Sequence, residues 1–136
     1  MSYLFDTNVC IALINGTSPR IRQRYIQATA QQALPQVSSI AVHELWYGVA
    51  KSSRIAQNAN RLAAFLNSAV AVLDYAAQDA QAAGEIRAEL ERKGKRIGEY
   101  DTLIAGQAFA RNLILVTANT KEFGRVKGLV VEDWTL

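Results

Sequence analysis

The sequence of 136 residues predicts a single α/β domain, residues 1–136, with a central, mostly parallel β-sheet of four to five strands flanked by helices. Short, wholly apolar segments alternate along the chain with longer amphipathic ones. Strands without polar residues are typical of a parallel sheet that is covered on both faces. Half of the residues are hydrophobic, Gly and Pro are sparse, and no repeat or linker divides the chain, which indicates one globular unit.

The first half of the chain contains two expected strands and four expected helices. Residues 3–5 form an apolar strand, and the apolar helical turn at 9–14 ends at an Asn-Gly pair. Apolar residues spaced four and three apart predict a helix over 19–32. A proline breaks the chain before a second strand at 36–38, and Ser39 is the expected N-cap of a helix that runs to residue 50. A further helix covers 55–67.

The second half repeats this alternation. Residues 70–73 are apolar and β-branched, which predicts a third strand. An amphipathic helix over 76–93 ends at Gly94 with basic residues in its last turn, as the helix dipole favours. Residues 100–111 are helical, residues 113–116 form a fourth strand with no polar residue, and 129–131 are the expected fifth strand.

Three acidic residues occupy positions where folding alone would favour apolar ones. Asp6 ends the first apolar strand, and Glu44 and Asp101 fall on the apolar faces of their helices. A carboxylate removed from water is costly unless it is paired, protonated or bound to a cation. Because none of the three has a basic partner nearby in sequence, we interpret them as one site for a divalent metal ion.

The predicted fold would bring these acids together. Ligands of open α/β sheets bind beyond the carboxyl ends of the strands, near a topological switch point. Asp6 sits at such an end, and Asn119 follows the strand at residues 113–116. Helical spacing places Glu44 and Asp101 on core-facing stripes, and Asp101 also lies in a first helical turn, where negative charge is favoured.

The ligand types indicate the ion. Carboxylate and amide oxygens without nearby His or Cys ligands favour Mg²⁺ or Mn²⁺ over zinc. His43 is the only histidine, which excludes a multi-histidine zinc site, and we interpret it as a structural or surface residue. A carboxylate-bound Mg²⁺ keeps water positions open, so the sequence predicts metal-assisted phosphoester hydrolysis with one or two ions.

These residues lie within motifs that resemble those of PIN-domain ribonucleases of the VapC toxin type, from bacterial type II toxin–antitoxin modules. The matching stretches are residues 4–8, 38–48, 84–90, 97–105, 115–123 and 131–134. They span nearly the whole chain in the expected order, so the match is specific.

The resemblance implies that Asp6, Glu44 and Asp101 are catalytic acids that bind Mg²⁺, for which Mn²⁺ can substitute. Asn119 joins them as a catalytic residue, in the place where many PIN domains carry a fourth Asp. Glu122 is a candidate for a compensating carboxylate. Glu99 departs from the family pattern, which usually has Pro there, and it either changes the affinity for metal or points to solvent.

The resemblance also implies a substrate and partners. Through the stretches at residues 84–90 and 132–134, the chain resembles toxins that cut initiator tRNA in the anticodon stem-loop and thereby inhibit translation. A homodimer neutralised by a VapB-type antitoxin is expected, with the antitoxin's C-terminal segment in the active-site groove and higher assembly on operator DNA through the antitoxin. The net charge of +3 permits a polyanionic partner.

The protein is expected to be cytoplasmic and not to contact a membrane. Cys10 is the only cysteine, so no intrachain disulfide forms, and we interpret it as a packed thiol. The apolar runs of the chain are shorter than the roughly 20 residues that a membrane span needs. Trp46 and Tyr47 are interpreted as core or dimer contacts rather than base-stacking residues, and the basic run at 92–96 as a solvated helix end rather than a phosphate-binding patch.

Two other functions compete with this interpretation. An aspartyl-nucleophile phosphatase of the haloacid dehalogenase type also has an acid at the end of its first strand. It needs a second Asp two residues later, where this chain has Asn8, and a downstream Lys that we cannot place. A PIN fold that binds RNA or protein without catalysis is the second alternative, and the intact trio of acids argues against it.

Overall fold

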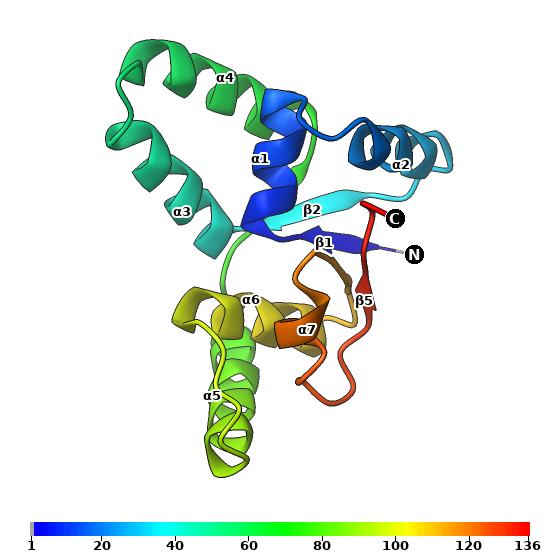
Figure 1. The fold of residues 1–136 in the computed structure, drawn as a ribbon, viewed down its shortest axis with the longest axis vertical. Coiled ribbons are helices and arrows are strands. Elements are labelled where there is room, and N and C mark those ends of the chain that lie inside the picture. Colours follow the sequence, from blue (N-terminus) through cyan, green and yellow to red (C-terminus); the bar gives the residue numbers. More distant parts are fainter. Residues whose placement is uncertain (1) are drawn as a thin grey trace.

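The computed structural model describes residues 2–136, which contain one sheet of five parallel strands with helices on both faces (Figure 1). The α/β prediction is confirmed. The spatial order of the strands is β3-β2-β1-β4-β5. The strands are β1 (Tyr3–Phe5), β2 (Pro35–Ser38), β3 (Ala71–Leu73), β4 (Ile114–Val116) and β5 (Val131–Glu132).

The helices divide into two groups on either side of the strands. In Figure 1, α1, α2 and α4 lie above β1 and β2, whereas α5, α6 and α7 lie below. This division follows the crossovers of a doubly wound sheet. The helices are α1 (Thr7–Asn15), α2 (Pro19–Ala30), α3 (Ser39–Ala50), α4 (Ile55–Ser68), α5 (Ala77–Arg92), α6 (Glu99–Ala110) and α7 (Thr120–Phe123).

The core centres on β1, because this strand is paired on both edges and covered on both faces. Leu4 and Phe5 are fully buried. Trp134, near the C-terminus, packs edge-on against Tyr3 and Phe5, with ring centroids 5.1 and 5.3 Å apart. The C-terminal segment therefore closes the core beside the first strand, and the termini lie close together in Figure 1.

Helices α5 and α6 pack with their backbones almost in contact. A Cβ added to Gly106 would lie 2.6 Å from the backbone nitrogen of Ala83, a separation that no side chain can tolerate. Glycine at this position therefore sets the spacing of the two helices, and α6 is the helix that carries Asp101.

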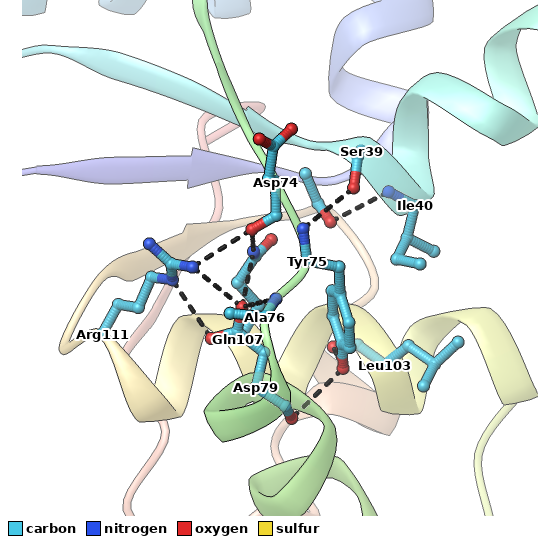
Figure 2. Close-up of polar contacts among 10 residues, drawn as sticks. Ser39, Ile40, Asp74, Tyr75, Ala76, Asp79, Leu103, Gln107 and Arg111 are labelled. Atoms are coloured by element: carbon cyan, nitrogen blue, oxygen red, sulfur yellow. Dashed lines mark hydrogen bonds and ion pairs between the residues drawn. The ribbon is translucent and has the colours of Figure 1, made fainter.

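A buried acid that the sequence analysis did not single out holds the same pair of helices (Figure 2). The carboxylate of Asp79 accepts hydrogen bonds from the Ala76 amide (2.8 Å), Gln107 Nε2 (3.0 Å) and the Arg111 guanidinium (3.1 and 3.0 Å). Burial opposes ionisation of Asp79, but these donors outweigh it and lower its pKa. Asp79 is thus a structural anion that joins the start of α5 to α6.

Three details differ from the sequence predictions. Ser38 rather than Ser39 caps α3, because its hydroxyl accepts from the Ile40 amide at 3.1 Å. The fifth strand begins and ends one to two residues later than predicted, at Val131–Glu132. The short helix α7 was not predicted, since four residues show no helical periodicity.

Candidate active site

The site lies at the carboxyl end of β1, where the order of the strands reverses. The sheet extends from β1 to β2 on one side and to β4 on the other. Since the connections leave in opposite directions, the ends of β1 and β4 border a crevice in folds of this kind. The Asp6 amide donates to the Val116 carbonyl at 3.1 Å, which joins the two strand ends.

Asp6 is buried and doubly anchored. One carboxylate oxygen accepts from the Val9 amide at 2.8 Å, so Asp6 is the N-cap of α1. The other oxygen accepts from the Thr117 hydroxyl at 2.5 Å, across the gap between β1 and β4. Burial raises the pKa of Asp6, the two hydrogen bonds oppose the increase, and the charge of Glu44 adds to it.

Glu44 comes from α3 and is half-buried. Its carboxylate accepts a hydrogen bond from the Thr7 hydroxyl at 2.7 Å. Thr7 directly follows Asp6, so this contact brings α3 to the first residue of α1. Asp6 itself caps α1, and the hydroxyl of Thr7 holds Glu44.

Asp101 lies in the first turn of α6 and is half-buried. Its pKa rises to about 6, first through burial and then through the charges of Glu44, Asp6 and Glu122. Unlike the shift of Asp6, this increase is not opposed by any hydrogen bond from the described residues. The three predicted acids therefore act on one another electrostatically, although only Asp6 is buried and the expectation of three buried acids was wrong for the other two.

Asn119 and Glu122 border the same group of acids. The Asn119 side-chain amide donates to Glu122 at 3.1 Å, and the Asn119 backbone amide donates to the Thr117 hydroxyl at 3.0 Å. Glu122 belongs to α7 and contributes to the raised pKa of Asp101. Glu99, by contrast, is exposed in the first turn of α6.

The donor chemistry of this group fits a divalent cation. All the side chains offer hard oxygen ligands, and none of the ion pairs within residues 2–136 involves Asp6, Glu44 or Asp101. In that part of the chain, however, no three acidic, His or Cys side chains are gathered closely enough to hold an ion as they stand. Metal ligation by these residues stays a prediction.

Two threonines of the site were not identified from the sequence in these roles. Thr117 is fully buried and hydrogen-bonds Asp6 from 111 residues away, and Thr7 hydrogen-bonds Glu44. A polar residue that directly follows an apolar strand was the available signal for Thr117, because it lies at the same sheet edge as Asp6.

The other residues singled out in the sequence lie outside the group of acids. Cys10 is fully buried, as predicted. Trp46 and Tyr47 are 39% and 60% exposed, so core packing, one of the two roles expected for them, is wrong. Arg92, Lys93 and Arg96 pair with acids of α5, which favours the solvated helix end over a phosphate patch. Among residues 2–136, no helix is long and apolar enough to cross a bilayer.

Comparisons with known proteins identify the family to which this fold belongs. The model of the PIN domain family matches residues 3–129 of this chain. The chain is 42% identical over 135 residues to a tRNA(fMet)-specific endonuclease VapC of Shigella flexneri, with 99% of each chain covered. It is also 42% identical to Ribonuclease VapC2 of Rickettsia felis, with 98% of each chain covered.

Solved structures show the same likeness. VapBC2 from Rickettsia felis bound to a DNA fragment from its promoter matches with a TM-score of 0.91 and 40% identity, covering 98% of this chain and 99% of that one. DNA-bound VapBC from Salmonella typhimurium matches with a TM-score of 0.90 and 42% identity, covering 98% of both chains. The chain therefore belongs to the PIN-domain family and, within it, to the VapC nucleases.

Proposed function

We propose that this chain is the toxin of a type II toxin–antitoxin module, a Mg²⁺-dependent endoribonuclease that cuts initiator tRNA in the anticodon stem-loop. Two relatives at 42% identity over nearly the full length carry the name tRNA(fMet)-specific endonuclease, which supports the substrate. Asp6, Glu44 and Asp101 are the proposed metal ligands, and Asn119 completes the proposed catalytic group.

One observation supports the chemistry most directly: a raised pKa for Asp101 among carboxylates that no basic side chain of residues 2–136 pairs with. Holding several acids together without a counter-charge costs stability, and a divalent cation would remove this cost. A bound Mg²⁺ would supply charge stabilisation at the phosphate and a more acidic water molecule. Mn²⁺ has similar ligand preferences and is expected to substitute for it.

The three proposed metal ligands differ in how firmly the chain holds them. Asp6 has a fixed position because the Val9 amide and the Thr117 hydroxyl hold its two oxygens. Glu44 is held at one oxygen by Thr7 and keeps the other for a ligand. Burial and nearby charges oppose the ionisation of Asp101, and no hydrogen bond from the described residues holds its carboxylate. Asp101 is therefore the side chain expected to move when a cation binds.

The test is cleavage of purified initiator and elongator tRNAs by the antitoxin-free protein, with Mg²⁺ or Mn²⁺ and with EDTA. Asp101→Asn is the inactive variant, and Asp74→Asn is the matched control, since Asp74 is an exposed acid that is not among the groups that raise the pKa of Asp101. We expect one metal-dependent cut in the initiator anticodon stem-loop by the parent and the control only.

The outcomes separate the parts of the proposal. Metal-dependent cutting of another RNA would retain the nuclease and reject the substrate. Unchanged cleavage by a folded Asp101→Asn variant would reject the assigned site. A folded, metal-loaded protein that cuts no RNA would indicate the alternative of a PIN fold that binds without catalysis.

A VapB-type antitoxin is the proposed partner, and the solved VapBC complexes of related chains support it. A homodimer of the toxin and assembly on operator DNA through the antitoxin complete this proposal. Because the proposed substrate is a cytoplasmic RNA, the protein is expected to act in the cytoplasm. Co-expression tests the partner: the antitoxin should copurify with the chain and stop the cleavage described above.

A further inference from the structure

An aromatic pair adjoins the acids of the candidate site. His43 Nε2 lies 3.3 Å from the Tyr100 hydroxyl, and the two ring centroids are 5.5 Å apart. His43 directly precedes Glu44 on α3, and Tyr100 directly precedes Asp101 on α6. The same approach of α3 to α6 therefore brings together both the aromatic pair and the two acids.

This pair lies on the solvent side of the acids. Glu44 and Asp101 are half-buried, whereas His43 is exposed and Tyr100 is 47% exposed. Neither ring contributes to the apolar core, so both are accessible from solvent beside a polar site.

We propose that His43 and Tyr100 form a stacking platform for a nucleobase next to the bond that is cut. This inference rests on the proposed ribonuclease function and specifies how the substrate is held. RNA loops are recognised by unstacked bases that lie against aromatic side chains, and a ring face accepts any base. A base on this platform would place its own phosphate near Glu44 and Asp101, which flank the rings in sequence.

The surface of α3 beyond the platform suits the continuing RNA strand. Tyr47 and Lys51 follow His43 at four-residue intervals, so the three share one face of the helix. The Lys51 ammonium lies 4.7 Å from the centre of the Tyr47 ring and joins none of the ion pairs within residues 2–136. Two rings are thus followed by a cation along this face, a combination that also occurs in sites that bind single strands.

The test combines protein variants with abasic RNA, using an anticodon stem-loop oligonucleotide that the parent protein cuts. Tyr100→Leu should raise KM about tenfold and leave kcat nearly unchanged, because stacking contributes to binding rather than to the chemical step. Tyr100→Phe keeps the ring and should behave like the parent. Phe109→Leu is the matched control, since Phe109 is also 47% exposed but lies near the other end of α6.

The abasic substitutions distinguish stacking from a purely structural role. Removing one base beside the cut should raise KM for the parent but cause little further loss with Tyr100→Leu, because both changes delete the same contact. His43→Leu should show the same non-additivity, and it serves as the second variant if Tyr100→Leu melts at a lower temperature.

Two results would overturn the platform while leaving the nuclease intact. One is an unchanged KM for both leucine variants. The same conclusion would follow if the KM increase from each leucine variant multiplied with the KM increase from the abasic substitution at every position. The other is a Tyr100→Phe variant as defective as Tyr100→Leu, which would mean that the hydroxyl contact between the helices matters and not the ring. A parent protein that cuts no RNA would instead reject the proposed function, and the platform with it.

Discussion

Replacing Asp101 by Asn should stabilise the metal-free protein at neutral pH. The folded-state pKa of Asp101 is about 6, against an ordinary value of 3.8. Two pKa units correspond to about 3 kcal/mol at most, because each unit is worth about 1.4 kcal/mol. Asp101 is only half-buried, so solvent screening reduces the expected gain to about 1–2 kcal/mol.

The sign of this effect depends on pH in a defined way. A carboxyl group with a raised pKa is destabilising when ionised, so the parent loses stability as the pH rises from about 4 to about 6. Asn carries no charge and shows no such loss. The two proteins should therefore be about equally stable near pH 4, with the variant ahead above about pH 6.

The assay is urea unfolding in EDTA, followed by the fluorescence of the buried Trp134, at about pH 4.5 and about pH 7.5. Asp74→Asn is the control, because Asp74 is an exposed carboxylate that is not among the groups that raise the pKa of Asp101. Figure 2 shows the Asp74 carboxylate pointing away from Arg111, whose guanidinium binds the Asp74 backbone carbonyl and the Asp79 carboxylate. Added Mg²⁺ should raise the melting temperature of the parent but not of Asp101→Asn.

An Asp101→Asn variant that is less stable than the parent at neutral pH would refute the reasoning. It would show that the Asp101 carboxylate is held by favourable contacts rather than opposed by Glu44 and Asp6. A stability gain of equal size at both pH values would also contradict it, because the gain would then not come from ionisation.

Three further substitutions test the contacts around the site. Thr117→Val removes the hydroxyl that anchors the buried acid of β1, so urea unfolding should show a loss of about 1–3 kcal/mol, and kcat should fall more than KM rises. Gly106→Ala places a methyl group 2.6 Å from the backbone of Ala83 and should cost about 1–3 kcal/mol in the same assay. Arg111→Met leaves Asp79 buried without its cation and should cost about 3 kcal/mol. Because Arg111 helps to lower the pKa of Asp79, this cost should diminish as acid protonates the Asp79 carboxylate of the variant.

The fold was predictable because local signals and tertiary structure agree in most of the chain. Strands β1 and β4, which pair at the centre of the sheet, contain only hydrophobic residues, and several of the helices have apolar faces. The prediction failed where an element is too short to show a period, as in α7 with four residues. The predicted bounds of the fifth strand were shifted from the observed ones, because β5 is an edge strand of two residues whose position depends on pairing with β4.

The site was predictable to the extent that its acids conflict with their surroundings. Asp6, Glu44 and Asp101 stood out because apolar residues would suit the same positions better. Thr117 gave no such conflict, since a threonine after a strand is unremarkable until the fold places it against Asp6. Asp79 was missed for the opposite reason, because an acid in the first turn of a helix looks like an ordinary response to the helix dipole.

The amide of Asn119 does not simply remove a charge from the site. Asn119 donates to Glu122 through its side chain and to the Thr117 hydroxyl through its backbone, while Thr117 donates to Asp6. A continuous series of hydrogen bonds thus runs from β1 through the end of β4 to α7. Glu122, at the end of this series, still acts on the pKa of Asp101, although less than Glu44 and Asp6 do. This effect supports the prediction that Glu122 compensates for the carboxylate missing at position 119, and Glu122 lies on α7, the helix that was not predicted.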